Sequence, residues 1–194
     1  TDGVIVNANN AVAARGYPHV ISNDWPEAFR ARRILALLAT LKRHSPASFA
    51  AIQTDIRSLG AHDLITAMLD ALPDAARQGD VPALMAAWNG SMDASRPEPL
   101  IFAAWSDALR RRLMDDELGN IADRYPGIRT RVINRMLTKR PSWCDDQRTD
   151  PMETCEQVVD ESLHAALAEL RMVYGDDINA WRWGAAHRVA FLHP

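Results

Sequence analysis

The chain of 194 residues is 47% hydrophobic and 24% charged, with a net charge of -3 and a pI of about 6.0. This composition predicts a globular protein with a substantial core, and the balance of acids and bases argues against a nucleic-acid-binding surface. The longest apolar run, from Ile34 to Leu41 with Thr40 inside it, is too short to span a bilayer. No basic and apolar leader opens the chain, so we expect any export signal to be absent or to lie outside it.

The N-terminal segment joins a short strand signal to side-chain amides. The β-branched run from Val4 to Val6 predicts a strand. The asparagines Asn7, Asn9 and Asn10 follow at its end. An amide in this position can donate a hydrogen bond into a cleft and stabilise the negative oxygen formed when an amide carbonyl is attacked. The segment therefore predicts part of an active site.

Helical periodicity begins near Pro26. The apolar face of this predicted helix carries Ile34, Leu37, Leu38 and Leu41. Arg30 lies on the same face one turn earlier, whereas Arg32 points to the opposite side as a solvated charge. A buried arginine needs a polar partner, so Arg30 either contacts a defined group or extends from the helix end into solvent.

Further helical segments follow along the chain. Ser45 is a predicted N-cap for a helix that ends at Gly60. The other predicted helices are one through Leu64 and Leu72 that ends at Pro73, a short one over 81–87, a long one over 100–118 with Phe102, Trp105, Leu109 and Leu113 in its core stripe, one over 121–137 that Pro126 and Gly127 interrupt, and one through Val158 and Leu170 that ends at Gly175.

A second strand is expected at the C-terminal end, over Trp181–His187 and Val189–Pro194. The fold class predicted from these elements is mainly α with short terminal β-strands, in one segment over 1–194. Residues 1–25 form a strand and loop, residues 26–175 a helical region, and residues 176–194 a return towards a sheet that other sequence completes.

The two cysteines, Cys144 and Cys155, flank a polar loop that contains Pro151. They could form a disulfide, which would indicate an oxidising compartment, or remain free thiols, and their spacing leaves both open. Zinc is not expected, because no second pair of Cys or His residues has ligand spacing.

No complete catalytic site is visible in the sequence. The six histidines are scattered, no Gly-x-Ser-x-Gly elbow occurs and no Gly-rich phosphate loop is present. Thr1 could in principle attack as an N-terminal nucleophile. It precedes Asn9 on the same strand, however, and could hardly face the same carbonyl from the opposite side. The chain thus has a hydrogen-bond donor without a nucleophile.

Several short motifs together resemble the penicillin amidase (penicillin acylase) family. They are Val4-Ile5-Val6-Asn7-Ala8-Asn9-Asn10, Tyr17-Pro18, Asp24-Trp25, Phe29-Arg30-Ala31-Arg32-Arg33-Ile34, Ile52-Gln53-Thr54-Asp55 with Ser58, Trp143-Cys144-Asp145-Asp146, Glu153-Thr154-Cys155, Trp183-Gly184-Ala185-Ala186-His187 and Phe191-Leu192-His193-Pro194. The resemblance covers nearly the whole chain in order.

This resemblance implies a segment of the β chain of an N-terminal nucleophile hydrolase of larger αββα fold. It implies that the nucleophilic serine lies upstream of Thr1, that Asn9 is the side-chain oxyanion donor, and that Arg30 holds Asn9. It also favours the Cys144–Cys155 disulfide and a periplasmic or secreted, autoproteolytically processed enzyme. The implied partners are an α chain and the remaining β-chain sequence. The family often carries a structural calcium ion, but no ligand carboxylate maps onto this segment, so we expect no cofactor here.

The implied function is hydrolysis of the acyl amide bond of N-acyl substrates, such as the side-chain amide of a penicillin in antibiotic biosynthesis. An N-acyl homoserine lactone acylase of the same family is the alternative substrate assignment, which would make the enzyme a quorum-quenching one. A non-catalytic helical interaction domain is the alternative outside enzymology, with Asn9 a turn former and Arg30 a surface charge. This segment alone is expected to be inactive.

Overall fold

The computed structural model describes residues 3–14, 16–124, 127 and 129–188, and the side chain of Asp123 is not described. The chain divides into two compact units, Thr1–Leu59 and Gly60–Pro194. The described residues are mainly helical and contain no β-strand, only isolated bridges. None of the described helices is both long enough and apolar enough to cross a membrane.

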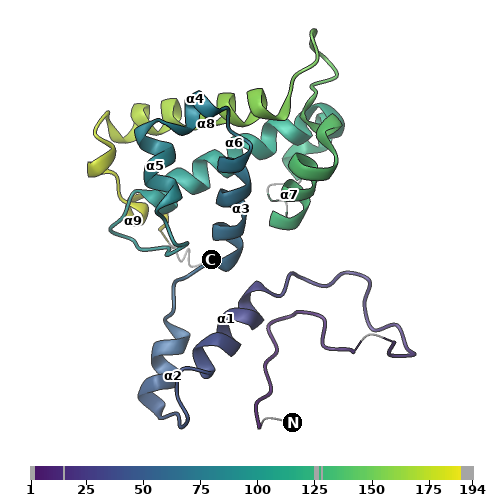
Figure 1. Ribbon diagram of the computed structural model, residues 1–194, viewed down its shortest axis with the longest axis vertical. Helices are drawn as coiled ribbons and strands as arrows, with labels where there is room; N and C mark the ends of the chain where they lie inside the picture. The colour runs from purple at the N-terminus through teal and green to yellow at the C-terminus, as the bar shows by residue number, and fades with distance from the viewer. Residues whose placement is uncertain (1–2, 15, 125–126, 128, 189–194) are drawn as a thin grey trace, which may run out of the picture. The chain divides into compact units, whose positions relative to one another are not determined.

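The described residues of the first unit form two helices, which follow a long segment without regular secondary structure (Figure 1). Helix α1 spans Phe29–Leu38 and α2 spans Pro46–Gln53. Ser45 caps α2 as predicted, because its side chain accepts from Ser48 N and Ser48 Oγ accepts from Ser45 N. Ala31 is the only residue of α1 that is buried, so few side chains of this helix are packed inside the first unit.

The predicted N-terminal strand is not present in the structure. Val4 and Ile5 are exposed, and Ile5 is 98% accessible. A strand needs a neighbour for its backbone hydrogen bonds, and the described residues supply none beside this segment. At the other end, Trp183–Ala186 form the short helix α9 instead of a strand, while residues 189–194 lie outside the described residues.

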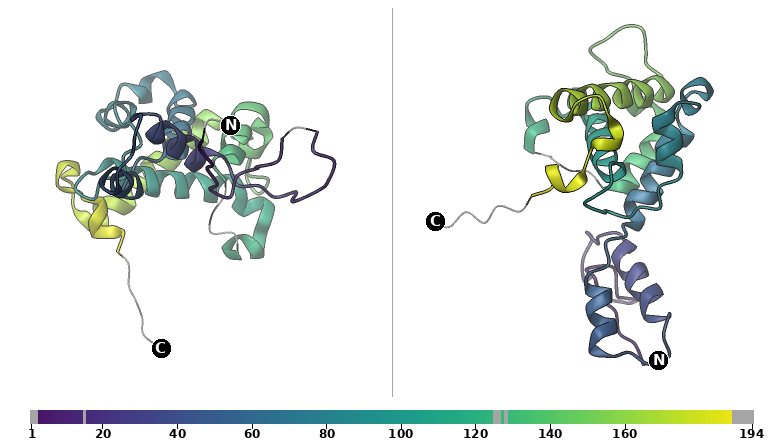
Figure 2. Two further views of the ribbon diagram at one scale, coloured as in Figure 1. Left: turned by 90° about the horizontal axis from the view of Figure 1, so that it is seen from below. Right: turned by 90° about the vertical axis from the view of Figure 1, so that its left-hand side faces the viewer.

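The second unit is built around two long helices. Helices α6, Glu98–Leu118, and α8, Cys155–Tyr174, lie side by side through it (Figures 1 and 2). The remaining elements around them are α3 (Leu59–Asp70), α4 (Asp74–Arg77), α5 (Asp80–Ala86), η1 (Gly119–Arg124), α7 (Thr130–Lys139), η2 (Pro141–Cys144), η3 (Ile178–Ala180) and α9.

The core of this unit is the predicted stripe of α6 packed on α8. Trp105 is fully buried, and its indole N–H donates to Val159 O and to Ser162 Oγ, both at 3.1 Å. Leu109 and Leu113 are also fully buried, whereas Phe102 is partly buried at the edge. Because the buried indole is paired, its burial adds apolar contact without an unsatisfied donor.

The helix boundaries agree with several sequence signals and correct others. Gly175 follows α8 with a φ of 82°, a conformation that glycine adopts without strain. Gly60 does not end α2, because that helix stops at Gln53 and the Thr54 hydroxyl donates a hydrogen bond to Ala50 O. Gly60 is instead buried in the first turn of α3. The predicted break of the 121–137 segment falls between η1 and α7.

Candidate active site

The asparagine segment folds into a turn through its own side chains. Asn9 N donates to Asn7 Oδ1 at 3.0 Å, and Ala8 N donates to Asn10 Oδ1 at 3.2 Å. Asn9 has a φ of 64°, in the left-handed region that asparagine tolerates better than most residues. Asn7 and Asn10 therefore act locally as turn formers, and they set the backbone from which the Asn9 side chain projects.

Arg30, in the first turn of α1, contacts this turn directly. Its Nη2 donates to Asn9 Oδ1 at 2.7 Å and to Ala8 O at 2.9 Å. The structure thus places the two sequence-predicted site residues together, across 21 positions of the chain. Arg30 is exposed, not buried on an apolar face as its helical position suggested, yet it has defined partners.

The contact with Arg30 determines how the Asn9 amide is oriented. A guanidinium only donates, so the oxygen of the amide must face Arg30 and the Nδ2 group must point away from it. Within the described part of the chain, Asn9 Nδ2 has no hydrogen-bond partner. The amide N–H bonds are therefore available to an acceptor that approaches from outside this turn.

An open hollow of about 470 Å³ lies beside Asn9. Its wall combines the amide with apolar and acidic side chains; it is lined by Asn7, Asn9, Val12, Ser22, Asp24, Trp25 and Pro26. All of these residues belong to the first unit. A carbonyl group that entered this hollow would meet the Asn9 amide as a hydrogen-bond donor.

A second cavity of about 390 Å³ lies between α1 and α2. Its lining is largely apolar, with Phe29, Ile34, Leu37, Ile52 and Leu59 among its residues, and it also includes Arg30, Arg33 and Asp55. Arg33 binds Asp55 with both arms of its guanidinium, Nε to Oδ2 at 2.9 Å and Nη2 to Oδ1 at 2.6 Å. These hydrogen bonds hold the pKa of the Asp55 carboxyl below its usual value.

The sequence interpretation did not identify this ion pair. The available signal was the spacing of Arg30 and Arg33, which places two arginines one turn apart on one helix face. Arg32, predicted as a solvated charge, is exposed, and its guanidinium lies 5.7 Å from the Phe29 ring centroid.

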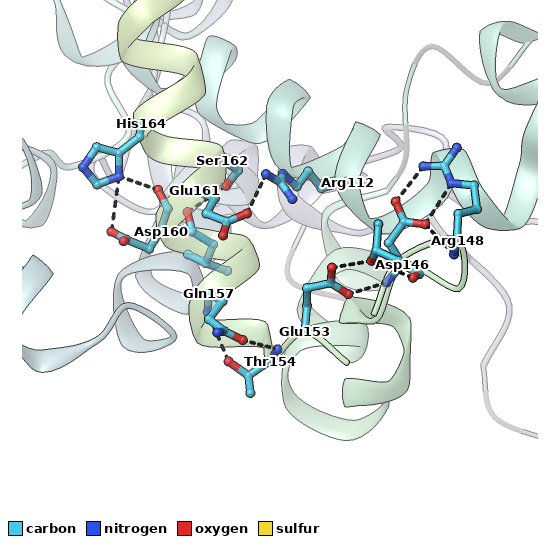
Figure 3. A network of polar contacts seen from close by, with 12 residues as sticks. Arg112, Asp146, Arg148, Glu153, Thr154, Gln157, Asp160, Glu161, Ser162 and His164 are labelled. Carbon is cyan, nitrogen blue, oxygen red and sulfur yellow. Dashed lines mark hydrogen bonds and ion pairs between the residues drawn. The ribbon is translucent and has the colours of Figure 1, made fainter. Parts of the chain in front are cut away.

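The polar loop between η2 and α8 is held by a network in the second unit (Figure 3). Arg148 donates to both carboxylate oxygens of Asp146, at 2.8 and 2.7 Å, and lowers the pKa of Asp146 to about 2. Glu153 accepts from Asp146 N at 3.1 Å, and Thr154 forms a capping box with Gln157 at the start of α8. Every one of these contacts stiffens the loop, and none activates a nucleophile.

Cys144 and Cys155 form a disulfide in the structure, with their Cα atoms 5.0 Å apart. The bond closes the loop, which projects from the end of α8 in Figures 1 and 2. Chain-entropy arguments give a stabilisation of about 2–3 kcal/mol for a ring of this size.

Replacing both cysteines by serine is expected to destabilise the protein by about this 2–3 kcal/mol, because the unfolded chain regains the freedom of the loop. Chemical denaturation of the complete protein measures the loss. Alkylation and mass spectrometry provide the control: reduction must release two thiols, and free thiols in the native protein would contradict the disulfide.

The described residues contain no group of three His, Cys, Asp or Glu side chains placed to hold a metal ion. Two of the histidines have polar contacts: His44 lies between Leu38 O and Ser48 Oγ, and His164 Nδ1 is 3.0 Å from Asp160 O.

Known proteins resemble this chain along nearly its whole length. The profile of the penicillin amidase family matches residues 1–194. An acyl-homoserine lactone acylase QuiP of Pseudomonas aeruginosa is 28% identical, over 95% of this chain and 25% of its own length. A penicillin acylase 2 proenzyme of a Pseudomonas species is 27% identical, over 99% of this chain and 25% of its own length. The chain thus spans about a quarter of the length of these relatives.

Proposed function

Because the chain belongs to the penicillin amidase family, we propose that it supplies the oxyanion-binding part of an amidohydrolase that cleaves the acyl amide bond of N-acyl substrates. The observation that carries the proposal is the 2.7 Å contact from Arg30 Nη2 to Asn9 Oδ1, which turns the amide N–H bonds towards an incoming acceptor. The names of both kinds of relative, acylases, support amide hydrolysis as the reaction.

The proposed nucleophile is an N-terminal serine of the mature enzyme, outside this chain. Its hydroxyl attacks the amide carbonyl carbon while its own α-amine takes the hydroxyl proton. The carbonyl oxygen becomes negative and accepts a hydrogen bond from Asn9 Nδ2. Collapse of this intermediate breaks the C–N bond, and the proton goes to the departing amine. Water then attacks the acyl-serine ester and gives up a proton through the α-amine, the bond from the acyl carbon to serine Oγ breaks, and the serine hydroxyl and the carboxylic acid are released.

Arg30 has two roles in the proposed mechanism. Its hydrogen bonds to Asn9 Oδ1 and Ala8 O hold the turn, so the donor is already oriented when charge develops. Its positive charge beside the amide also polarises the N–H bonds towards the oxyanion. In both respects Arg30 acts through Asn9, as a positioning residue.

The proposed setting is a processed enzyme in an oxidising compartment such as the periplasm. The name proenzyme on one relative supports maturation from a longer precursor, in which an α chain and the remaining β-chain sequence accompany this segment. The Cys144–Cys155 disulfide suits an oxidising compartment.

Two candidate substrates, which differ in their acyl group and amine, are compatible with this function. A penicillin-type side-chain amide is the first. An N-acyl homoserine lactone is the second, and it is favoured by the relatives named as acyl-homoserine lactone acylases. The experiment is a screen of the complete processed protein against amides with short, aromatic and long acyl groups, including both substrate types, with the released amine and acid measured.

We expect amine and acid to appear in equal amounts for at least one acyl class, and the preferred class decides between the two substrates. Absence of hydrolysis across the whole panel would contradict the proposal and favour a helical interaction domain without catalysis.

A further inference from the structure

We propose that the Arg33–Asp55 ion pair is a positioning element for the Arg30–Asn9 contact, so that Asp55 and Arg33 influence catalysis without touching the substrate. The inference rests on the proposed function. It assigns a role to two residues that lie outside the turn carrying Asn9 and that form a bidentate ion pair with each other.

The first observation is the weak support of α1. No side chain caps its N-terminus, its N-cap is Ala28, and Ala31 is its one buried residue among those described. Arg30 stands in the first turn of this helix, where ends commonly fray. The other apolar side chains that face α2, such as Ile34 and Leu37, are only half-buried, so packing alone fixes the position of Arg30 in part.

The second observation is the geometry of the ion pair. Arg33 follows Arg30 by one helical turn on the same face, and both line the cavity between α1 and α2 with Asp55. Asp55 lies just after the end of α2, beyond the C-cap residue Thr54. The two parallel N–H···O bonds fix distance and orientation together, as a single bond would not.

The third observation is that the pair is shielded from water. The side chains of Arg33 and Asp55 are 24% and 18% exposed, whereas those of Arg148 and Asp146 in a comparable bidentate pair are 62% and 26% exposed. A shielded, bidentate pair is screened less by solvent than an exposed one and holds its elements more firmly.

A small rotation of α1 is enough to affect catalysis. Turning α1 by about 10° about its axis would displace a side-chain group on its surface by roughly 1 Å. A misplacement of about 1 Å in a catalytic group can cost on the order of 100-fold in rate. The two hydrogen bonds between Arg33 and Asp55 hold α1 to the segment after α2. Their loss is thus expected to move Arg30 and, through it, the Asn9 amide.

The test is Asp55→Asn in the complete processed enzyme, because asparagine keeps the shape but loses the charge and one acceptor. We expect kcat to fall about 10- to 100-fold, with KM changed less than about 3-fold. Asp55→Glu, which keeps the carboxylate, should recover part of this loss. Asp146→Asn is the matched control, since it makes the same change in the bidentate Asp146–Arg148 pair of the second unit, and its kcat should equal that of the parent.

A double-mutant cycle shows whether Asp55 acts through Arg30. In an Arg30→Ala background, Asp55→Asn should lower kcat no further, because the contact that it positions is already gone. An equal fall in both backgrounds would overturn the inference, and so would an unchanged kcat in Asp55→Asn. If Asp55→Asn fails to fold, Arg33→Lys replaces it in the cycle, because lysine keeps the charge but lacks the fork.

The outcome for Asn9→Ala separates this inference from the proposed function. Full activity of Asn9→Ala would refute the proposed function itself. An inactive Asn9→Ala enzyme together with a fully active Asp55→Asn enzyme would refute only the role of the ion pair.

Discussion

Replacing Asn9 by alanine in the complete processed enzyme is expected to lower kcat about 100- to 1,000-fold, which corresponds to ~2.7–4 kcal/mol of lost transition-state stabilisation. The reason is geometric: Arg30 binds Asn9 Oδ1 at 2.7 Å and leaves the amide N–H bonds as donors for the oxyanion. Substrate binding and chain maturation should change much less, because the donor acts mainly on charge that develops in the transition state. Steady-state kinetics with the best substrate of the acyl screen measure the effect.

Asn120→Ala is the matched control for this variant. Asn120 lies in η1 of the second unit and is exposed, so the same truncation there removes no proposed donor. Its kcat should equal that of the parent enzyme. Near-normal turnover in Asn9→Ala, with Asn120→Ala also normal, would contradict the role of Asn9.

Replacing Trp105 by alanine is expected to destabilise the second unit by about 3–5 kcal/mol. The indole is fully buried between α6 and α8, so truncation leaves a large cavity and removes its hydrogen bonds to Val159 O and Ser162 Oγ. Hydrogen exchange followed by mass spectrometry on the complete protein, with peptides from α6 and α8, measures the free energy of opening.

Trp105→Phe separates the volume of the indole from its hydrogen bonds. Phenylalanine keeps most of the apolar contact but has no N–H, so a smaller loss is expected than for alanine. If exchange in α6 and α8 of the alanine variant matched that of the parent protein, Trp105 would not be the centre of this core.

Local sequence signals predicted the long helices of the second unit well. The stripe of Trp105, Leu109 and Leu113 is buried, and α6 ends at Leu118 as predicted. These features follow from apolar periodicity within one helix, which the residues themselves specify. Ser45 and Gly175 were predictable for the same reason, since a cap depends on a few neighbouring residues.

Features that depend on a distant partner were not predictable in the same way. The strand expected at Val4–Val6 requires backbone hydrogen bonds to another strand, and the described residues provide none. The prediction that Gly60 ends a helix was also wrong, because tertiary packing buries this residue inside α3. A glycine marks a helix end only where no such packing competes.

The candidate site also combines features that local sequence predicts with features that depend on distant contacts. The apolar stripe drew attention to Arg30, and the family resemblance selected Asn9 from the three asparagines. Their 2.7 Å contact depends on how the turn at Asn9 folds back to α1. The Arg33–Asp55 pair was missed, because it joins α1 to the residues after α2 and no local pattern encodes that approach. Side-chain contacts between elements had to come from the structure.

The most direct test of the central claim, that Asn9 stabilises the oxyanion, is the affinity of a transition-state analogue. An alkylboronic acid that matches the preferred acyl group forms a tetrahedral adduct with a serine nucleophile and places a boronate oxygen where the oxyanion forms. We predict that Asn9→Ala weakens boronate binding by the same factor by which it lowers kcat/KM, while the affinity for an unreactive substrate analogue stays unchanged. Equal boronate affinity in the parent and in Asn9→Ala would contradict the account.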